Sequence, residues 1–131
     1  MIKKFLIAIV VVFVAIQVMD YVLHSLILGH IYQQNASIWR PNMMNLMWAM
    51  HLSTFIVTVC FVYIYYKLIQ NKSAFRGVWY GIVYGIAAGM GMGYSTYCMF
   101  PIPYVLAVSW FFGSVIIYTI AGLITALIIK E

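Results

Sequence analysis

Electric charge is scarce in this chain, and acidic side chains are the scarcest of all. Charged residues make up 7% of the 131 residues, and only Asp20 and Glu131 are acidic. Soluble globular domains carry roughly 25% charged residues, so this composition excludes an ordinary soluble domain. Hydrophobic residues make up 66% of the sequence and its mean hydropathy is +1.04, which together indicate an integral membrane protein.

Cysteine is also rare, and the motifs of common enzymes are absent from the sequence. The two cysteines, Cys60 and Cys98, lie in predicted helices at depths that differ by about 20 Å, beyond the ~7 Å that a disulfide can span. The sequence contains no nucleophile and base motif, no HExxH motif and no phosphate loop. Its two carboxylates are predicted at opposite sides of the membrane, so they cannot act as an acid and base pair. We therefore expect no enzymatic activity.

Apolar residues are gathered into four long blocks. The blocks cover residues 5–28, 45–66, 78–97 and 104–129, and each is close to the ~20 residues that a helix needs to cross a bilayer. The opening MIKKFLIAIVVVFVAI has the basic start of a secretory signal, but its apolar run exceeds the ~7 to 15 residues of such a signal. The sequence therefore predicts an all-α bundle of four transmembrane helices, a single domain over residues 1–131 in contact with lipid.

Basic residues fall almost entirely on one side of the predicted membrane. Arg40 follows the first block, whereas the other six lie at the termini or between the second and third blocks: Lys3, Lys4, Lys67, Lys72, Arg76 and Lys130. By the positive-inside rule, the N- and C-termini are expected to be cytoplasmic. Anionic lipid head groups, and not nucleic acid, are the expected partners of these charges.

The third block carries glycine at a strict spacing of four, the pattern of a glycine zipper. The members of this ladder are Gly77, Gly81, Gly85, Gly89 and Gly93. Glycine costs a helix about 1 kcal/mol relative to alanine, so five in register require a packing reason. Repeated GxxxG steps let two helix backbones approach closely. The partner is expected to be another helix of the same chain or, as the alternative, a second copy or another subunit of a larger complex.

Polar side chains form a constellation in the outer half of the first two blocks. Offsets of three and four residues place Gln17, Asp20 and His24 on one helix face, and His51, Thr54 and Thr58 on another. Asp20 is predicted about 12 Å deep and His51 about 9 Å, so the two faces match in level. Ionisable groups inside a membrane are costly unless paired. We interpret the constellation as a hydrogen-bonded latch between the two helices, which Arg40 completes by reaching Asp20.

Two alternatives give the constellation a function of its own. His24 and His51 are a minimal pair of axial ligands for haem b, and the thioethers of Met43 and Met47 with the His51 imidazole suit copper(I). A proton or small-solute pathway is the other alternative, although it needs polar groups at every depth and the stripe ends at Thr58. The latch needs no cofactor, and we favour it.

Three segments carry a resemblance to a known group of proteins. They are DYVLHSLILGHIYQ, ASIWRP and FPIPYVLAVSWF, with the glycine-rich block between the second and the third. This combination resembles an uncharacterised group of short bacterial four-helix integral membrane proteins. The resemblance implies four spans and a bacterial cytoplasmic (inner) membrane, and it supplies no activity or cofactor. We therefore expect a small non-enzymatic membrane protein that acts as an accessory or interaction subunit.

Overall fold

The computed structural model describes residues 1–130, and their long elements are all helices. Four long helical segments follow the four apolar blocks, with ends within four residues of those predicted. Their elements, with the short helices between them, are α1 (Ile2–Tyr21), η1 (Val22–Ile27), α2 (Gly29–Gln34), η2 (Ala36–Ile38), η3 (Met43–Leu46), α3 (Met47–Tyr63), η4 (Ile64–Leu68), α4 (Ala74–Gly89), η5 (Met90–Ser95), α5 (Thr96–Met99) and α6 (Tyr104–Ile128). Three of these, η1, η4 and η5, are π-helical turns that continue an α-helix.

Three of the long helices are long and apolar enough to cross a membrane. They are Ile2–Ile27, Met43–Leu68 and Tyr104–Ile128. The fourth, which covers residues 74–99, is of similar length but contains six of the nine glycines of the chain together with several tyrosines, residues of low hydropathy. The described residues therefore form a helical membrane protein with three candidate spans, and the fourth span stays a prediction.

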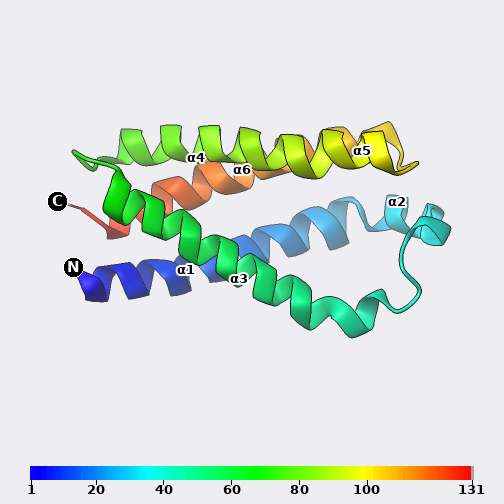
Figure 1. Ribbon diagram of the computed structural model, residues 1–131, viewed down its shortest axis with the longest axis horizontal. Helices are drawn as coiled ribbons and strands as arrows, with labels where there is room; N and C mark the ends of the chain where they lie inside the picture. Colours follow the sequence, from blue (N-terminus) through cyan, green and yellow to red (C-terminus); the bar gives the residue numbers. More distant parts are fainter. Residues whose placement is uncertain (131) are drawn as a thin grey trace.

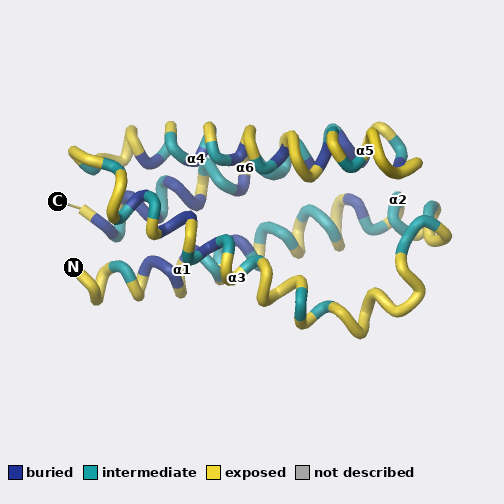
Figure 2. The backbone as a smooth tube through the Cα atoms, in the orientation of Figure 1, coloured by how far each residue is buried: buried dark blue, intermediate teal, exposed yellow. Residues whose placement is uncertain are grey.

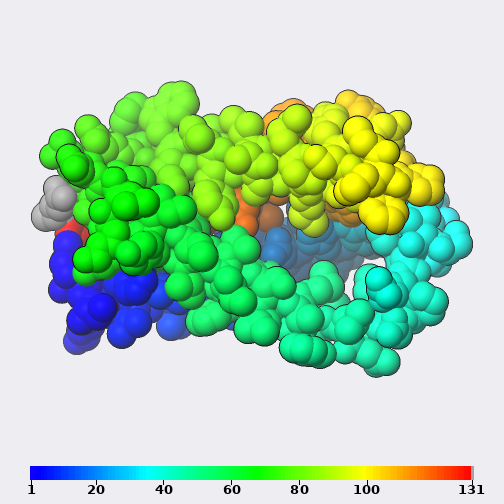
Figure 3. Space-filling model, viewed as in Figure 1, coloured from blue at the N-terminus to red at the C-terminus, as the bar shows by residue number. Residues whose placement is uncertain are grey.

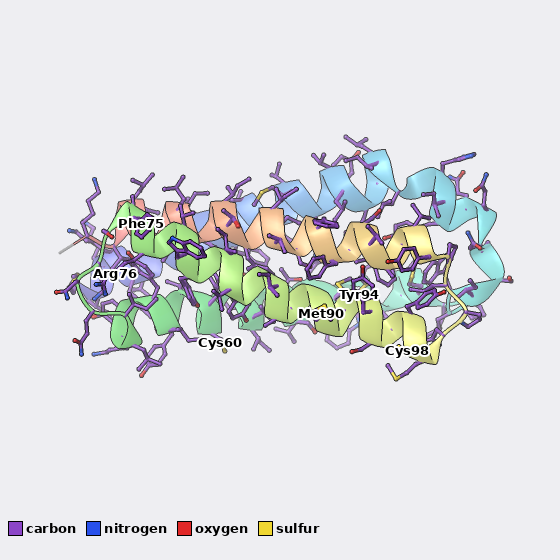
Figure 4. All side chains as sticks on the ribbon, turned by 90° about the horizontal axis from the view of Figure 1, so that it is seen from above. Cys60, Phe75, Arg76, Met90, Tyr94 and Cys98 are labelled. Carbon is purple, nitrogen blue, oxygen red and sulfur yellow. The ribbon has the colours of Figure 1, made fainter. Side chains whose placement is uncertain are left out.

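The helices run up and down between two ends of the molecule (Figure 1). Both chain termini and the turn between η4 and α4 lie at one end, here called the terminal end. The connections that contain α2 and α5 lie at the other, called the loop end. Arg76 is at the terminal end, where its guanidinium donates a hydrogen bond of 2.8 Å to the carbonyl of Gln70 (Figure 4). Cys60 and Cys98 are far apart along the bundle, and both thiols are free, which confirms that they form no disulfide (Figure 4).

The larger core lies toward the terminal end (Figure 2). It is built from side chains of α1, α3, η4 and α6, including Val12, Phe61, Tyr65 and Ile117. The ring of Tyr80 on α4 stacks on Phe61 at 4.6 Å between centroids, and its hydroxyl donates to the Phe61 carbonyl. Aromatic packing and this hydrogen bond thus tie α4 to α3 inside the core.

The glycine ladder of α4 and η5 faces α6 of the same chain. All five glycines of the ladder are buried. A Cβ atom added to Gly85 would lie 2.7 Å from the Val115 Cα, and one added to Gly89 would lie 2.8 Å from the Phe111 carbonyl oxygen. Because these contacts are with backbone, which cannot rotate away, any larger residue would push the helices apart.

The same contact corrects one of the two expectations for this ladder. A second copy or another subunit was the alternative partner of the glycine face, but α6 already covers that face from Gly77 to Gly93. Gly91 lies off the ladder, and a Cβ atom added there would have no heavy atom within 4 Å. A partner chain would therefore have to bind elsewhere on the molecule.

Candidate functional site

A cleft of about 490 Å³ lies toward the loop end, between α1 with η1, α3 and α6. Figure 3 shows the hollow between α3 and the η5–α5 segment, on a side of the bundle and not at its tip. Met92 of η5 contributes to the wall on that side. The polar side chains on the walls include Gln17, Asp20, His24, His51, Thr54 and Ser114. The structure therefore brings most of the predicted constellation to one cavity.

The cleft exists because α3 separates from the rest of the bundle as it approaches the loop end (Figure 1). Near the crossing of α1 and α3, the rings of Phe13 and Phe55 meet edge to face at 5.4 Å between centroids. The buried residues of α3 all lie beyond that point toward the terminal end. Toward the loop end most of its side chains are exposed, and Trp48 is 67% exposed (Figure 2).

One hydrogen bond spans the cleft between the two predicted faces. The Gln17 amide nitrogen donates to His51 Nδ1 over 2.8 Å, and the two residues are 34 positions apart along the chain. The acceptor role of Nδ1 places the proton of a neutral His51 on Nε2. The matching depths of these two residues were visible in the sequence, and the structure joins them as a latch between α1 and α3.

A second polar cluster is centred on Tyr32 of α2 and shares His24 and Trp110 with the lining of the cleft. The Trp110 indole donates to the Tyr32 hydroxyl over 2.7 Å, and that hydroxyl lies 2.6 Å from His24 Nδ1. Because the hydroxyl oxygen accepts from Trp110, its own proton is free to point to His24. The Trp39 indole donates to the Tyr32 carbonyl over 3.1 Å. Tyr32 of α2 thus holds together side chains from η1, from α6 and from the connection after η2.

The surroundings of Tyr32 affect its ionisation. Burial raises the pKa of the Tyr32 phenol to about 12, the Trp110 hydrogen bond opposes that rise, and the negative charge of Asp20 adds to it. Tyr32 therefore remains a neutral hydrogen-bonding group at physiological pH. It was not among the predicted site residues, because the connection after the first apolar block was expected to be a loop and instead contains the helical turns of α2.

Asp20 and Arg40 are not brought together, contrary to expectation. Asp20 lies on the wall of the cleft, and its carboxylate makes no hydrogen bond or ion pair with any of the residues 1–130. Arg40 is exposed and lines a separate depression at the loop end, beside Phe100 and Ile102. The reason is local, because Trp39 is anchored on Tyr32 and Trp110 and holds the following residue at the surface.

The threonines of α3 end the polar wall. The Thr54 hydroxyl donates to the Met50 carbonyl, and the Thr58 hydroxyl donates to the Thr54 carbonyl. Thr54 lines the cleft, whereas Thr58 is fully buried and does not. Below this level the lining contains Ile16, Val57 and Ile117. The polar lining of the cleft therefore stops where the apolar core begins.

The ligands considered for haem or copper are only partly gathered. His24 and His51 both line the cleft, and each uses Nδ1 in a hydrogen bond. Among residues 1–130, no three His, Cys, Asp or Glu side chains lie close enough to hold a metal ion. Met47 lines the cleft, but Met43 belongs to the 3-10 turn η3 and is exposed, so the expected helical stripe of methionine and histidine is interrupted. Nothing in this arrangement favours haem or copper over another occupant.

Comparison with known proteins identifies no family for this chain. No family model matches it, and neither a curated protein nor a solved structure does. The resemblance to short bacterial four-helix proteins therefore remains a sequence observation.

Proposed function

We propose that this chain is a four-span integral membrane protein that acts as a non-enzymatic accessory subunit, and that its cleft receives a polar group of a partner molecule within the membrane. The observation that carries the proposal is the sideways opening of a cavity whose largely apolar walls carry several polar side chains. In a bilayer, that opening faces lipid. A polar group exposed to hydrocarbon without a partner costs several kcal/mol, so these walls are suited to holding a polar occupant.

The two pairs of helices have separate roles in this proposal. The contact of α4 with α6 is a rigid scaffold, because glycine places the two backbones against each other. The loop-end half of α3 is the binding element, since it lies away from the core and is joined to α1 by the hydrogen bond of Gln17 to His51. The helix of residues 74–99 is the fourth span, which puts the two termini on one side.

The proposed orientation follows from the placement of charge. Six lysine and arginine residues lie at the terminal end, before, after or between the spans. At the loop end, Arg40 is the one such residue. The positive-inside rule then places the terminal end in the cytoplasm and opens the cleft toward the outer half of the bilayer. A bacterial cytoplasmic membrane is the proposed location, supported by the resemblance of the three sequence segments.

The test is to fill the cleft and ask whether binding is lost. Ser53 lines the cleft and Ser95 does not, and both are exposed serines toward the loop end. We expect the wild-type chain, released from native membrane into the gas phase of a mass spectrometer, to carry one bound molecule. Ser53→Phe is expected to remove that added mass and Ser95→Phe to retain it. The proposal would be contradicted if the wild-type chain never carried a bound molecule, or if both variants retained the bound molecule equally.

A further inference from the structure

The carboxylate of Asp20 lacks a counter-ion within the part of the chain that the structure describes. No hydrogen bond or ion pair to the Asp20 carboxylate occurs among residues 1–130, and the cleft wall on which it lies contains no lysine or arginine. The one basic residue of the loop end, Arg40, lies in the separate depression. A charged side chain inside a membrane is normally paired, or it lines a cavity that takes up a substrate or an ion. A cation supplied from outside the chain would complete the pair.

The walls around Asp20 suit an organic cation better than a bare metal ion. The rings of Tyr21, Trp110 and Tyr118 line the same cleft, and aromatic faces attract ammonium groups. The remaining polar walls offer hydroxyl and amide groups, which accept hydrogen bonds from N–H donors. A metal ion would need several ligands at short distance, and no group of three His, Cys, Asp or Glu side chains is close enough to provide them in residues 1–130.

The shape of the cleft indicates how such a cation arrives. The opening lies on the side of the bundle, so the route in is from the bilayer and not from water. The lining becomes apolar below Thr54, at Val57 and Ile117, and can contact an alkyl chain. The volume of about 490 Å³ falls within the ~300 to 1,000 Å³ of small-molecule sites. A polar head group on an apolar chain fits all three features.

We propose that the cleft binds the ammonium head group of an amphiphile, with the Asp20 carboxylate as its counter-ion and the alkyl chain left in the bilayer. This inference rests on the proposed function, for which it names the ligand class. Two sources share this chemistry: an aminophospholipid of the membrane and a free long-chain amine. Ammonium is recognised by its charge, its N–H donors and the aromatic faces around it, so the N-acetyl derivative of the same amphiphile, in which a neutral amide replaces the ammonium, is the discriminating control.

The experiment compares two matched probe pairs on the purified full-length chain. The first pair is phosphatidylethanolamine and its N-acetyl derivative, and the second is dodecylammonium and N-dodecylacetamide. Retention of each probe is measured by native mass spectrometry of the wild type, Asp20→Asn and Glu131→Gln. Glu131→Gln removes the only other acidic side chain of the sequence and is the matched charge control.

The wild type is expected to prefer each ammonium probe to its amide by about tenfold, which corresponds to ~1.4 kcal/mol. Asp20→Asn should reduce that preference to near one, and Glu131→Gln should keep it. A preference confined to the phospholipid pair identifies a lipid, and one confined to the dodecyl pair a free amine; either supports the inference. The wild-type comparison needs no variant, so a folding defect in Asp20→Asn cannot hide the answer.

Three results overturn the inference, and the first two separate it from the proposed function. If the wild type retains ammonium and amide probes equally and Ser53→Phe blocks both, the cleft binds amphiphiles but not through charge, and only the inference fails. If no probe is retained better by the wild type than by Ser53→Phe, the proposed function fails with it. A tenfold preference that persists in Asp20→Asn would also overturn the assignment of Asp20.

Discussion

The pair of α4 and α6 and the pair of α1 and α3 are joined in opposite ways. Glycines hold α4 and α6 at backbone contact along nearly their whole length. By contrast, α1 and α3 separate beyond the contact of Phe13 with Phe55 and are then joined by Gln17 and His51 across a cleft. Lipid is as apolar as the side chains, so association in a membrane depends on close packing and hydrogen bonds. The first pair uses packing and the second uses a hydrogen bond, and only the second leaves a cavity.

The largest expected effect comes from breaking the closed pair. Gly85→Leu places a side chain where the Cβ alone would lie 2.7 Å from the Val115 backbone. We expect the free energy of unfolding in detergent to fall by more than about 3 kcal/mol, since overpacking against backbone cannot relax.

Gly91→Leu is the matched control for that substitution. Its position has no heavy atom within 4 Å of an added Cβ, so we expect a change within about 1 kcal/mol. Circular dichroism during denaturation measures both variants. Equal losses in the two variants would show that glycine is needed there for a reason other than contact with α6.

An intermediate effect is expected at the loop end of the cleft. Tyr32→Phe removes the hydroxyl that accepts from Trp110 and lies against His24, and it leaves both partners without that hydrogen bond. A loss of about 1 to 3 kcal/mol in stability should follow. The emission of Trp110 should also change, because its indole N–H loses an acceptor.

The control for Tyr32→Phe is another pair of tyrosine hydroxyls. Tyr94 and Tyr104 share a hydrogen bond of 3.2 Å at an exposed site, and Tyr94→Phe should cost less than about 0.5 kcal/mol. If Tyr94→Phe destabilises the protein as much as Tyr32→Phe does, the cluster around Tyr32 has no special importance.

The smallest effect on stability is expected from breaking the latch. A double-mutant cycle of Gln17→Leu and His51→Leu should give a coupling energy of about 0.6 kcal/mol, the average for hydrogen bonds between membrane helices. The substitutions should nevertheless change the binding of amphiphiles, since both side chains line the cleft. A coupling energy of zero would mean that the hydrogen bond does not position α3.

The helices could be predicted well from the sequence because their packing determines two local patterns. These are the long apolar runs and the spacing of four residues between glycines. The ends of the four helical segments agree within four residues, and the spacing of the glycines predicts the face that contacts α6. The levels of Gln17 and His51 also followed from helix geometry alone, because a rise of about 1.5 Å per residue sets depth.

The parts that the sequence did not predict depend on the connection between α1 and α3. Its residues form short helices that bring Tyr32 onto His24 and Trp110, and no local pattern records the contact with Trp110, which is 78 positions away. The same packing of Trp39 keeps Arg40 away from Asp20, although the charges of the two suggested a pair. The π-helical turn η1 adds to the difficulty, because it shifts the face on which His24 lies relative to an α-helix.

The most direct test of the contrast is a pair of distance distributions between spin labels. The two native cysteines are first replaced by alanine, in a Cys60→Ala, Cys98→Ala background. Labels on the exposed residues Leu26 and Trp48 then report on the open pair, α1 and α3. Labels on the exposed residues Trp79 and Ile116 report on the closed pair, α4 and α6. We expect the closed pair to give one narrow distance in every lipid. The open pair should give a broad distribution in phosphatidylglycerol that narrows when phosphatidylethanolamine or dodecylammonium is added. Narrow distributions for both pairs, unchanged by either amphiphile, would contradict an open cleft that takes a ligand from the membrane.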